Sequence, residues 1–306
     1  MKTMTLRQLR AVQAAQRTGR IVKAARELGL TQPAVSLQIQ QAEALAGTPL
    51  FDRLRGGLRP TAAGTAVVEA AQAIEEHLRA LGDELDAIRS GKRGRLRLGV
   101  VSTAKYIAPA IMAALIRAHP DIEMSLWVGN RAETIASLEA HQIDLALMGR
   151  PPREFPVRAM QFGPHPFVII APVDHPLAGQ QHISKLRIAE EHFLVREPGS
   201  GTRVALDIYL SEIPGRIDNI GVELGSNETI KQAVMAGLGI ALISAHTIAQ
   251  EIEIGRLAIL RAEGMPIQRH WFLVSRADRM LTPAMQAFEQ FLQRQGSQFL
   301  PQVRGA

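Results

Sequence analysis

Apolar positions change their spacing twice along the chain of 306 residues. In the first 48 residues they recur at helical spacing, as Leu6, Leu9 and Val12 do. Over residues 65–90 the apolar positions are spaced four and three residues apart. From about residue 95, short apolar runs alternate with helical stretches. We therefore predict an N-terminal helical domain over 1–64, a long helix over 65–90 and a larger α/β domain over 91–306.

Two helices of the N-terminal domain have the spacing of a helix-turn-helix. Ala25 would let the two helices approach closely, Gly29 would form the left-handed turn between them, and Val35 would pack beneath the second helix. Thr31 is placed to cap that second helix, and Pro33 is tolerated in its first turn. An ordinary three-helix core with a polar outer face is the alternative interpretation.

The second helix carries polar side chains that are suited to reading base edges. Gln32, Ser36 and Gln40 share one face, and glutamine can make a bidentate contact with adenine. Residues 50–61 then indicate a hairpin around Gly56-Gly57, a basic wing whose arginines can meet phosphates. The DNA contacts predicted from this pattern are Thr31, Gln32, Pro33, Ser36, Gln40, Arg53, Arg55 and Arg59.

Charge separates the N-terminal domain from the rest of the chain. Residues 1–61 have a net charge of +7 and the whole chain has +6, so the remainder carries −1. A basic module on a nearly neutral body indicates a polyanion, here double-stranded DNA, as the partner of that module. Cysteine is absent, and no apolar run approaches the roughly 20 residues that span a bilayer. We expect a cytoplasmic protein without a membrane partner.

The predicted long helix bears one continuous apolar seam. Its members repeat at steps of four and three residues, which is the heptad pattern of a coiled coil. A stripe packed on the helix's own domain is the alternative, but a seam between two separate domains favours pairing with a second chain. The predicted dimerisation residues are Val67, Ala71, Ile74, Leu78, Leu81, Leu85 and Ile88.

After the long helix, the pattern of strand, helix and strand implies a parallel α/β sheet. The sequence has no Walker loop, no His-Glu-x-x-His and no Gly-x-Ser-x-Gly motif, and its nine histidines are scattered. We therefore expect neither an enzyme nor a metal site nor a bound cofactor. The α/β domain alone would suit a solute-binding protein, but such a protein would need an export signal and would not carry a basic winged head.

The N-terminal domain resembles the DNA-binding domain of the LysR-type transcriptional regulators. The resemblance covers residues 3–64 without a gap, and its runs include Thr31-Gln32-Pro33-Ala34-Val35-Ser36, Leu50-Phe51-Asp52-Arg53 and Leu58-Arg59-Pro60-Thr61-Ala62-Ala63-Gly64. Leu37 departs from the pattern, since many members have arginine there. In this family the linker helices pair two wings, so the resemblance implies a homodimer, and two such dimers would form a homotetramer.

The resemblance extends through the α/β domain and implies two α/β subdomains of the periplasmic-binding-protein type. Crossings near Gly163-Pro164 and Met265–Arg269 would place 95–163 and 269–300 in subdomain I and 164–268 in subdomain II. Ligands of such folds bind in the cleft between the subdomains, at the carboxyl ends of strands. The expected fold class is therefore α/β, with an N-terminal winged helix-turn-helix and a linker helix.

Polar residues that follow strands or open helices are the candidates for that cleft. Hydroxyl and N–H groups at helix starts favour anions, and cations can converge on the same ligand. The plainer alternatives are that Ser102 and Ser226 cap helices, that 198–201 is an ordinary loop, and that any one cation faces solvent. The predicted effector site consists of Ser102, Thr103, Lys105, Asn130, Arg131, Arg150, Gly199, Ser200, Thr202, Arg203, Ser226 and Asn227.

A narrower resemblance concerns three short runs, Gly99–Pro109, Val128–Arg131 and Leu147–Pro152. They are similar to the LysR-type regulators of Calvin-cycle (RuBisCO) operons. The resemblance implies an activator of carbon-fixation genes that contacts RNA polymerase and senses a small anionic metabolite such as a sugar phosphate, phosphoenolpyruvate or NADPH. A regulator of another pathway that senses an aromatic or amino-acid-derived carboxylate is the alternative.

Overall fold

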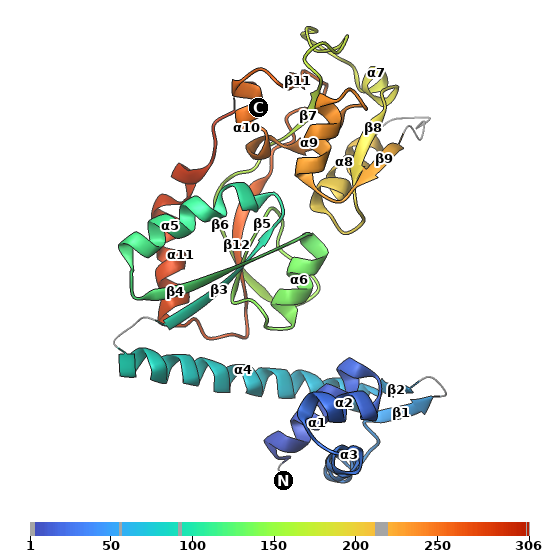
Figure 1. Ribbon diagram of the computed structural model, residues 1–306, viewed down its shortest axis with the longest axis vertical. Helices are drawn as coiled ribbons and strands as arrows, with labels where there is room; N and C mark the ends of the chain where they lie inside the picture. The colour runs from blue at the N-terminus through green and yellow to red at the C-terminus, as the bar shows by residue number, and fades with distance from the viewer. Residues whose placement is uncertain (1–3, 55–56, 91–93, 212–219, 304, 306) are drawn as a thin grey trace. The chain divides into compact units, whose positions relative to one another are not determined.

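The structure, a computed structural model, describes residues 4–54, 57–90, 94–211, 220–303 and 305. The chain divides into two units, Met1–Leu85 and Asp86–Ala306, each with its own hydrophobic core. Figure 1 shows the elements of each unit. No helix in the described ranges combines the length and apolar character that a membrane span requires.

The first unit is a helical domain followed by a hairpin and a long helix. Thr5 and Gln8 form a capping box at the start of its first helix, and Gly19, Gly29 and Gly47 end the first three helices in the left-handed conformation. The elements are α1 (Leu6–Thr18), α2 (Ile21–Leu28), α3 (Gln32–Ala46), β1 (Phe51–Leu54), β2 (Gly57–Pro60) and α4 (Ala62–Ser90).

Small side chains lie where the three short helices meet. Ala15, Ala24 and Val35 are fully buried, which lets the helix backbones approach closely. The antiparallel strands β1 and β2 place Phe51 opposite Pro60, and Phe51 and Leu50 close the same core. The first helices and the hairpin therefore form one packed domain.

Subdomain I of the second unit is built around a mixed sheet with strand order β4-β3-β5-β12-β6. Strands β3, β4 and β5 are parallel, whereas β12 runs antiparallel to both β5 and β6. Its elements are β3 (Gly94–Val101), η1 (Ala104–Tyr106), α5 (Ala108–Ala118), β4 (Ile122–Gly129), α6 (Arg131–Glu139), β5 (Leu145–Met148), β6 (Val157–Pro164), β12 (His270–Arg276), α11 (Pro283–Gln295) and η3 (Gly296–Phe299).

Subdomain II contains an antiparallel sheet, β10-β7-β11, and a parallel pair, β8 and β9. Its elements are β7 (Phe167–Ala171), α7 (Lys185–Ala189), β8 (Phe193–Arg196), α8 (Gly201–Ser211), β9 (Ile220–Leu224), α9 (Asn227–Met235), β10 (Ala241–Ser244), η2 (Ala245–Thr247), α10 (Ala249–Glu253) and β11 (Ala258–Leu260).

The predicted fold class is confirmed, and the predicted parallel arrangement holds for β3, β4 and β5, whereas β12 and the sheet β10-β7-β11 add antiparallel pairs. Strand β12 runs opposite to β5 and β6 because the chain leaves subdomain I after β6 and returns to it only before β12. The two connections lie side by side: the His165 N–H donates to the Arg269 carbonyl (2.7 Å), and Phe167 and Ile267 exchange two backbone hydrogen bonds. The strand that returns to subdomain I therefore enters its sheet in the opposite direction.

Candidate functional site

Helix α3 presents one polar face and one buried face. Val35, Ile39 and Ala42 are buried against the first unit's core, while Gln32, Pro33 and Gln40 are exposed and Ser36 is half-buried. The Thr31 hydroxyl accepts a hydrogen bond from the Ala34 N–H (3.4 Å) and caps the helix. These five predicted DNA contacts, Thr31, Gln32, Pro33, Ser36 and Gln40, thus lie at or near the N-terminal half of one helix.

The hairpin is fixed to the turn between α1 and α2. The Leu58 N–H donates to the Gly19 carbonyl (2.8 Å), and a Cβ at Gly57 would overlap that carbonyl oxygen. Arg59 is exposed on β2, and Arg53 lies in β1 with a side chain outside the described part of the structure. Arg55 lies outside the described residues. The roles of the three arginines stay predictions.

The apolar seam of α4 divides into two parts. Ala71 is fully buried, and Val67 packs against the core of the first unit. Four further members of the seam are 40–55% exposed in the single chain, and the side chain of Ile88 lies outside the described part. The exposed members are Ile74, Leu78, Leu81 and Leu85. The structure therefore leaves this second part of the seam available to a second chain, and dimerisation stays a prediction.

A cavity of about 260 Å³ lies between the two subdomains of the second unit. Both subdomains and both connections contribute side chains to its wall. The lining residues are Val101, Ser102, Thr103, Arg131, Gly149, Arg150, Arg153, Glu154, His165, Phe167, Ser200, Gly201, Thr202, Val204 and Arg269.

Half of the predicted effector-site residues line this cavity. They come from the ends of β3 and β5, from the start of α6 and from the start of α8, which are the positions that the strand-end rule selects. The six are Ser102, Thr103, Arg131, Arg150, Ser200 and Thr202. Ser200 and Thr202 are also hydrogen-bonded to each other, the Thr202 N–H donating to the Ser200 hydroxyl (3.3 Å).

Three of the other predicted effector residues sit in structural roles at or beside helix ends. The Asn130 side chain forms a capping box with Glu133 at the start of α6, and Ser226 caps α9 by accepting from the Thr229 N–H (3.0 Å). The Lys105 ammonium lies over the Tyr106 ring, 5.2 Å from its centre. None of these three lines the cavity in the described structure.

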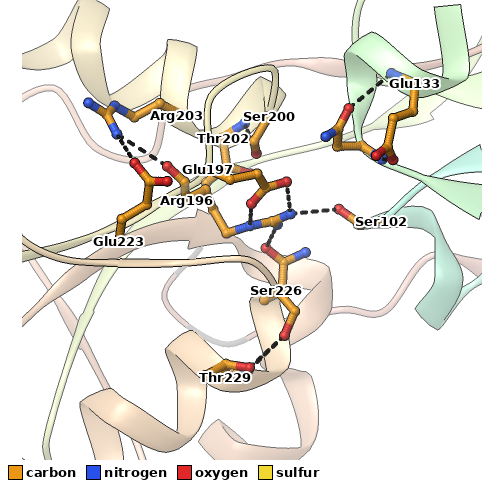
Figure 2. Close-up of polar contacts among 12 residues, drawn as sticks. Ser102, Glu133, Arg196, Glu197, Ser200, Thr202, Arg203, Glu223, Ser226 and Thr229 are labelled. Atoms are coloured by element: carbon orange, nitrogen blue, oxygen red, sulfur yellow. Dashed lines mark hydrogen bonds and ion pairs between the residues drawn. The ribbon is translucent and has the colours of Figure 1, made fainter. Parts of the chain in front are cut away.

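Two of the remaining three, Asn227 and Arg203, bind the buried Arg196, whose guanidinium Figure 2 shows between Glu197 and Ser102. The Arg196 guanidinium donates to the Glu197 carboxylate, to the Asn227 amide oxygen and to the Ser102 hydroxyl (3.3 Å). Since Ser102 belongs to subdomain I and Arg196 to subdomain II, the network joins the subdomains beside the cavity.

Arg203 and Gly199 complete this picture. Arg203 forms ion pairs with Asp207 and Glu223 and donates to the Arg196 carbonyl, away from Ser102 in Figure 2. The Gly199 carbonyl accepts from the Ala132 N–H (3.1 Å), a second contact between the subdomains. These residues hold the walls of the cavity in place without lining it.

The strand-end rule missed Arg153, Glu154, His165, Phe167 and Arg269. Arg153 and Glu154 lie in the segment between β5 and β6, while the other three lie at the two connections. The signal that could have found the latter three is the crossing itself, because a cleft between two subdomains must have the connecting segments as its floor.

Positive charge dominates the cavity wall. Four arginines, Arg131, Arg150, Arg153 and Arg269, line it together with one carboxylate, Glu154. Burial lowers the pKa of Arg131, which the Glu154 carboxylate opposes and Arg150 reinforces. Burial and the neighbouring Arg150 likewise lower the pKa of Arg269. The guanidinium groups therefore repel one another in a partly desolvated space, an arrangement that a bound anion would relieve.

The floor of the cavity contains a buried aromatic stack. The His165 ring lies on the Trp271 indole with centres 3.6 Å apart, and the Trp271 N–H donates to His246 Nδ1 (3.0 Å). His165 Nε2 is 3.0 Å from the Ser244 hydroxyl. Burial, together with His246 and Arg269, holds the pKa of His165 well below its usual value, and burial lowers the pKa of His246 to about 4. Both rings are therefore neutral at pH 7 and pack as ordinary aromatic groups.

Comparison with known families accounts for both units. Residues 6–65 match the family described as "Bacterial regulatory helix-turn-helix protein, lysR family", and residues 89–297 match "LysR substrate binding domain". The chain belongs to the LysR family of DNA-binding transcriptional regulators, which are not enzymes.

Individual relatives are similar over nearly the whole chain. The HTH-type transcriptional regulator CbbR of Rhizobium meliloti (strain 1021) is 59% identical over 303 residues, 99% of this chain and 97% of the relative. The RuBisCO operon transcriptional regulator of Allochromatium vinosum is 44% identical over 289 residues, 94% of this chain and 95% of the relative. Among solved structures, the Synechocystis PCC6803 CcmR regulatory domain in complex with 2-PG is 37% identical with a TM-score of 0.63, covering 65% of this chain and 96% of that domain.

Proposed function

We propose that this chain is a cytoplasmic regulator that activates a RuBisCO operon and that a small phosphorylated anion in the cavity modulates its binding to DNA. The relatives named for that operon support the target genes. The observation that carries the ligand class is the cavity wall, where four arginines and one carboxylate leave a surplus of positive charge beside four hydroxyl groups.

The chemistry of the wall fits a phosphorylated metabolite better than an aromatic one. Guanidinium groups bind phosphate and carboxylate oxygens through paired, charge-assisted hydrogen bonds. The hydroxyls of Ser200 and Thr202 lie at the start of α8, where free N–H groups and the helix dipole favour negative charge. Val101, Val204 and the phenyl ring of Phe167 add apolar surface for the carbon skeleton of a ligand, while the four guanidinium groups favour a strongly anionic one. The complex of CcmR with 2-PG is consistent with this ligand class.

Ligand binding would act through the relative setting of the two subdomains. A ligand that touches Ser102 and Arg150 on one side and Ser200 and Thr202 on the other binds best where both sides are in reach. The ligand can shift the equilibrium between two arrangements of the subdomains only by the difference between its affinities for those arrangements. In the assembled protein, a dimer of dimers paired through α4, this change would alter DNA bending and contact with RNA polymerase.

Calorimetric titration of the full-length protein tests the ligand class. The probes are 2-PG, ribulose bisphosphate, phosphoenolpyruvate and NADPH, with benzoate as an aromatic comparison. We expect saturable binding of at least one phosphorylated probe and none of benzoate. Arg150→Met should weaken that binding about 10-fold or more, since a hydrogen bond to a charged group contributes roughly 1.5–3 kcal/mol. Arg256→Met, at an exposed arginine outside the cavity, is the matched control.

Footprinting of the DNA upstream of the RuBisCO genes, with and without the same probes, tests the regulatory part. A footprint whose length or bend changes with a phosphorylated probe supports the whole proposal. A firm footprint that no phosphorylated probe alters would reject the ligand class and leave the operon assignment intact. Protection of no RuBisCO promoter would reject the operon assignment.

A further inference from the structure

Leu37 lies at the centre of the exposed face of α3. A helix turns about 100° per residue, so Leu37 lies about 200° from both Val35 and Ile39, nearly opposite the buried side of the helix. Its side chain is 51% exposed. The residue opposite the buried side of α3 is thus an aliphatic one, and Gln40 and Gln41 are exposed beside it.

The neighbours of Leu37 do not cover it. Pro33 stands one turn before it and Gln40 almost one turn after it, and both are exposed. Gln41, on the adjoining side, accepts a hydrogen bond from the Gln8 side chain (3.2 Å), which holds α3 against α1. Leu37 is therefore not a member of the core cluster of the first unit.

An exposed leucine is common on protein surfaces and by itself indicates nothing. Its position makes this one informative, because the second helix of a helix-turn-helix enters the major groove with its outer face toward the bases. Leucine can neither donate nor accept a hydrogen bond, so against most base edges and all phosphates it would only displace water from polar groups. The C5-methyl group of thymine is the apolar group that the major groove offers.

We propose that Leu37 is a specificity-determining residue that packs on the C5-methyl group of a thymine in each half-site. It would distinguish thymine from the other bases at that position, while Gln32, Ser36 and Gln40 read polar edges beside it. This inference rests on DNA binding by the helix-turn-helix and is independent of the ligand and of the operon.

The expected effect is small and well defined. Removing one methyl group from an apolar contact costs about 0.8 kcal/mol, which corresponds to a loss of about fourfold in affinity. Uracil in place of thymine removes that methyl group and keeps the base pair and its hydrogen-bonding groups. The DNA can therefore be altered by one methyl group at a time.

The test begins with an operator obtained by selection of the full-length protein on random duplexes, which makes it independent of any promoter. Each thymine of the selected sequence is then replaced by uracil in turn, and dissociation constants are measured for the wild type, Leu37→Ala and Leu37→Met. Leu186→Ala, at a 61% exposed leucine in α7, is the control for loss of a surface leucine.

We expect the wild type and Leu186→Ala to bind about fourfold more weakly when uracil replaces one particular thymine of a half-site. Leu37→Ala should bind the thymine operator more weakly and show no further loss with uracil at that position. Leu37→Met, which keeps an apolar side chain, should retain most of the discrimination. A wild type that tolerates uracil everywhere would overturn the proposal. A loss at one thymine that is equal in the wild type and Leu37→Ala would also overturn it, since another residue would then contact the methyl group.

Discussion

The proposed DNA-reading face of α3 and the cavity proposed to bind the ligand are built in opposite ways. The face is a run of residues within about two and a half turns of α3, positioned by one cap and three buried side chains. The cavity takes its wall from β3, α6, the end of β5, α8 and both connections between the subdomains, so Ser102 and Arg269 line the same cavity although they lie 167 positions apart in the sequence. A local site keeps its geometry if one helix is intact, whereas a composite site depends on how two bodies are held.

The difference suits the two tasks. A face that reads bases must keep a fixed shape, because base edges are fixed. A sensor must change when its ligand binds, and a wall shared between two subdomains changes when their setting changes. Substitutions should therefore separate cleanly into those that affect the first unit and those that affect the second.

The largest expected effect is at Gly64, in the first turn of α4. A Cβ there would overlap the Leu50 carbonyl oxygen, which is backbone and cannot rotate away. We expect Gly64→Ala to lower the free energy of unfolding of the first unit by about 3 kcal/mol and to abolish DNA binding, with ligand binding unchanged. Gly82→Ala, where the space is open, is the control. Both tryptophans lie in the second unit, so hydrogen exchange reports on the first unit and fluorescence on the second. Loss of both signals together would contradict the separation.

Acid should affect the second unit first. Burial lowers the pKa of His246 to about 4. Burial, together with the nearby Arg276 and Arg279, which outweigh Asp278, also lowers the pKa of His141 to about 4. The pKa of the fully buried His165 lies well below its usual value. Each of these groups binds its proton more weakly in the folded protein than in the unfolded chain, where the pKa is about 6.5. Their stabilisation is complete above pH 6.5 and is lost as the pH falls toward 4.

Tryptophan-monitored unfolding in denaturant between pH 7 and pH 4 measures this loss. The slope should reach up to about 1.4 kcal/mol per pH unit for each histidine. None of these three buried histidines belongs to the first unit, which should therefore show a smaller slope by hydrogen exchange. His141→Gln should reduce the slope of the second unit. Equal slopes in the two units would refute the assignment.

Substitutions at two residues that were both predicted to bind the effector should differ in their effect on ligand affinity. Thr202 lines it and Ser226 caps α9 outside it. We expect Thr202→Val to weaken binding of the phosphorylated probe about 10-fold, within the range of a hydrogen bond to a charged group. Ser226→Ala should leave the affinity unchanged and lower stability by about 1 kcal/mol through the lost cap. Calorimetry and thermal unfolding distinguish the two, and equal losses of affinity would show that the described cavity is not the whole site.

The most narrowly confined effect concerns the choice of base. Gln32→Ala should reduce discrimination between operator and random duplex by about 1–3 kcal/mol, the typical contribution of a bidentate base contact. Competition binding measures it, and affinity for random DNA should be unchanged. If both affinities fell equally, Gln32 would contact the backbone instead of a base.

The contrast between the two sites also explains what the sequence could predict. Helix caps have local signals, since each cap lies within three residues of the group it binds: the cap at Thr31 was predicted, the cap at Ser226 was the alternative interpretation, and the cap at Asn130 was missed in favour of an effector role. The face of α3 followed from helical spacing alone. These features depend on near neighbours, and near neighbours are what a sequence displays.

Features that depend on contacts between residues far apart in the sequence could not be predicted. Nothing near Arg196 indicates that its guanidinium donates to the Ser102 hydroxyl, and nothing near His165 indicates that its ring lies on Trp271. The edge strand β6 has an irregular pattern of burial and ends at Pro164, so it lacks the alternation of a typical strand. Strand direction in β12 depends on where the chain returns, which no local spacing encodes.

The hydrogen bond from Leu58 to Gly19 joins the hairpin to the start of the helix-turn-helix through main-chain atoms alone. Substitutions of surface side chains cannot remove such a bond. We therefore expect one helix-turn-helix domain to cover a fixed length of operator. Substitutions in α3 could then alter the preferred bases without altering that length. Any variation in the spacing of half-sites must then be accommodated between heads, by the parts of the assembly beyond the hairpin.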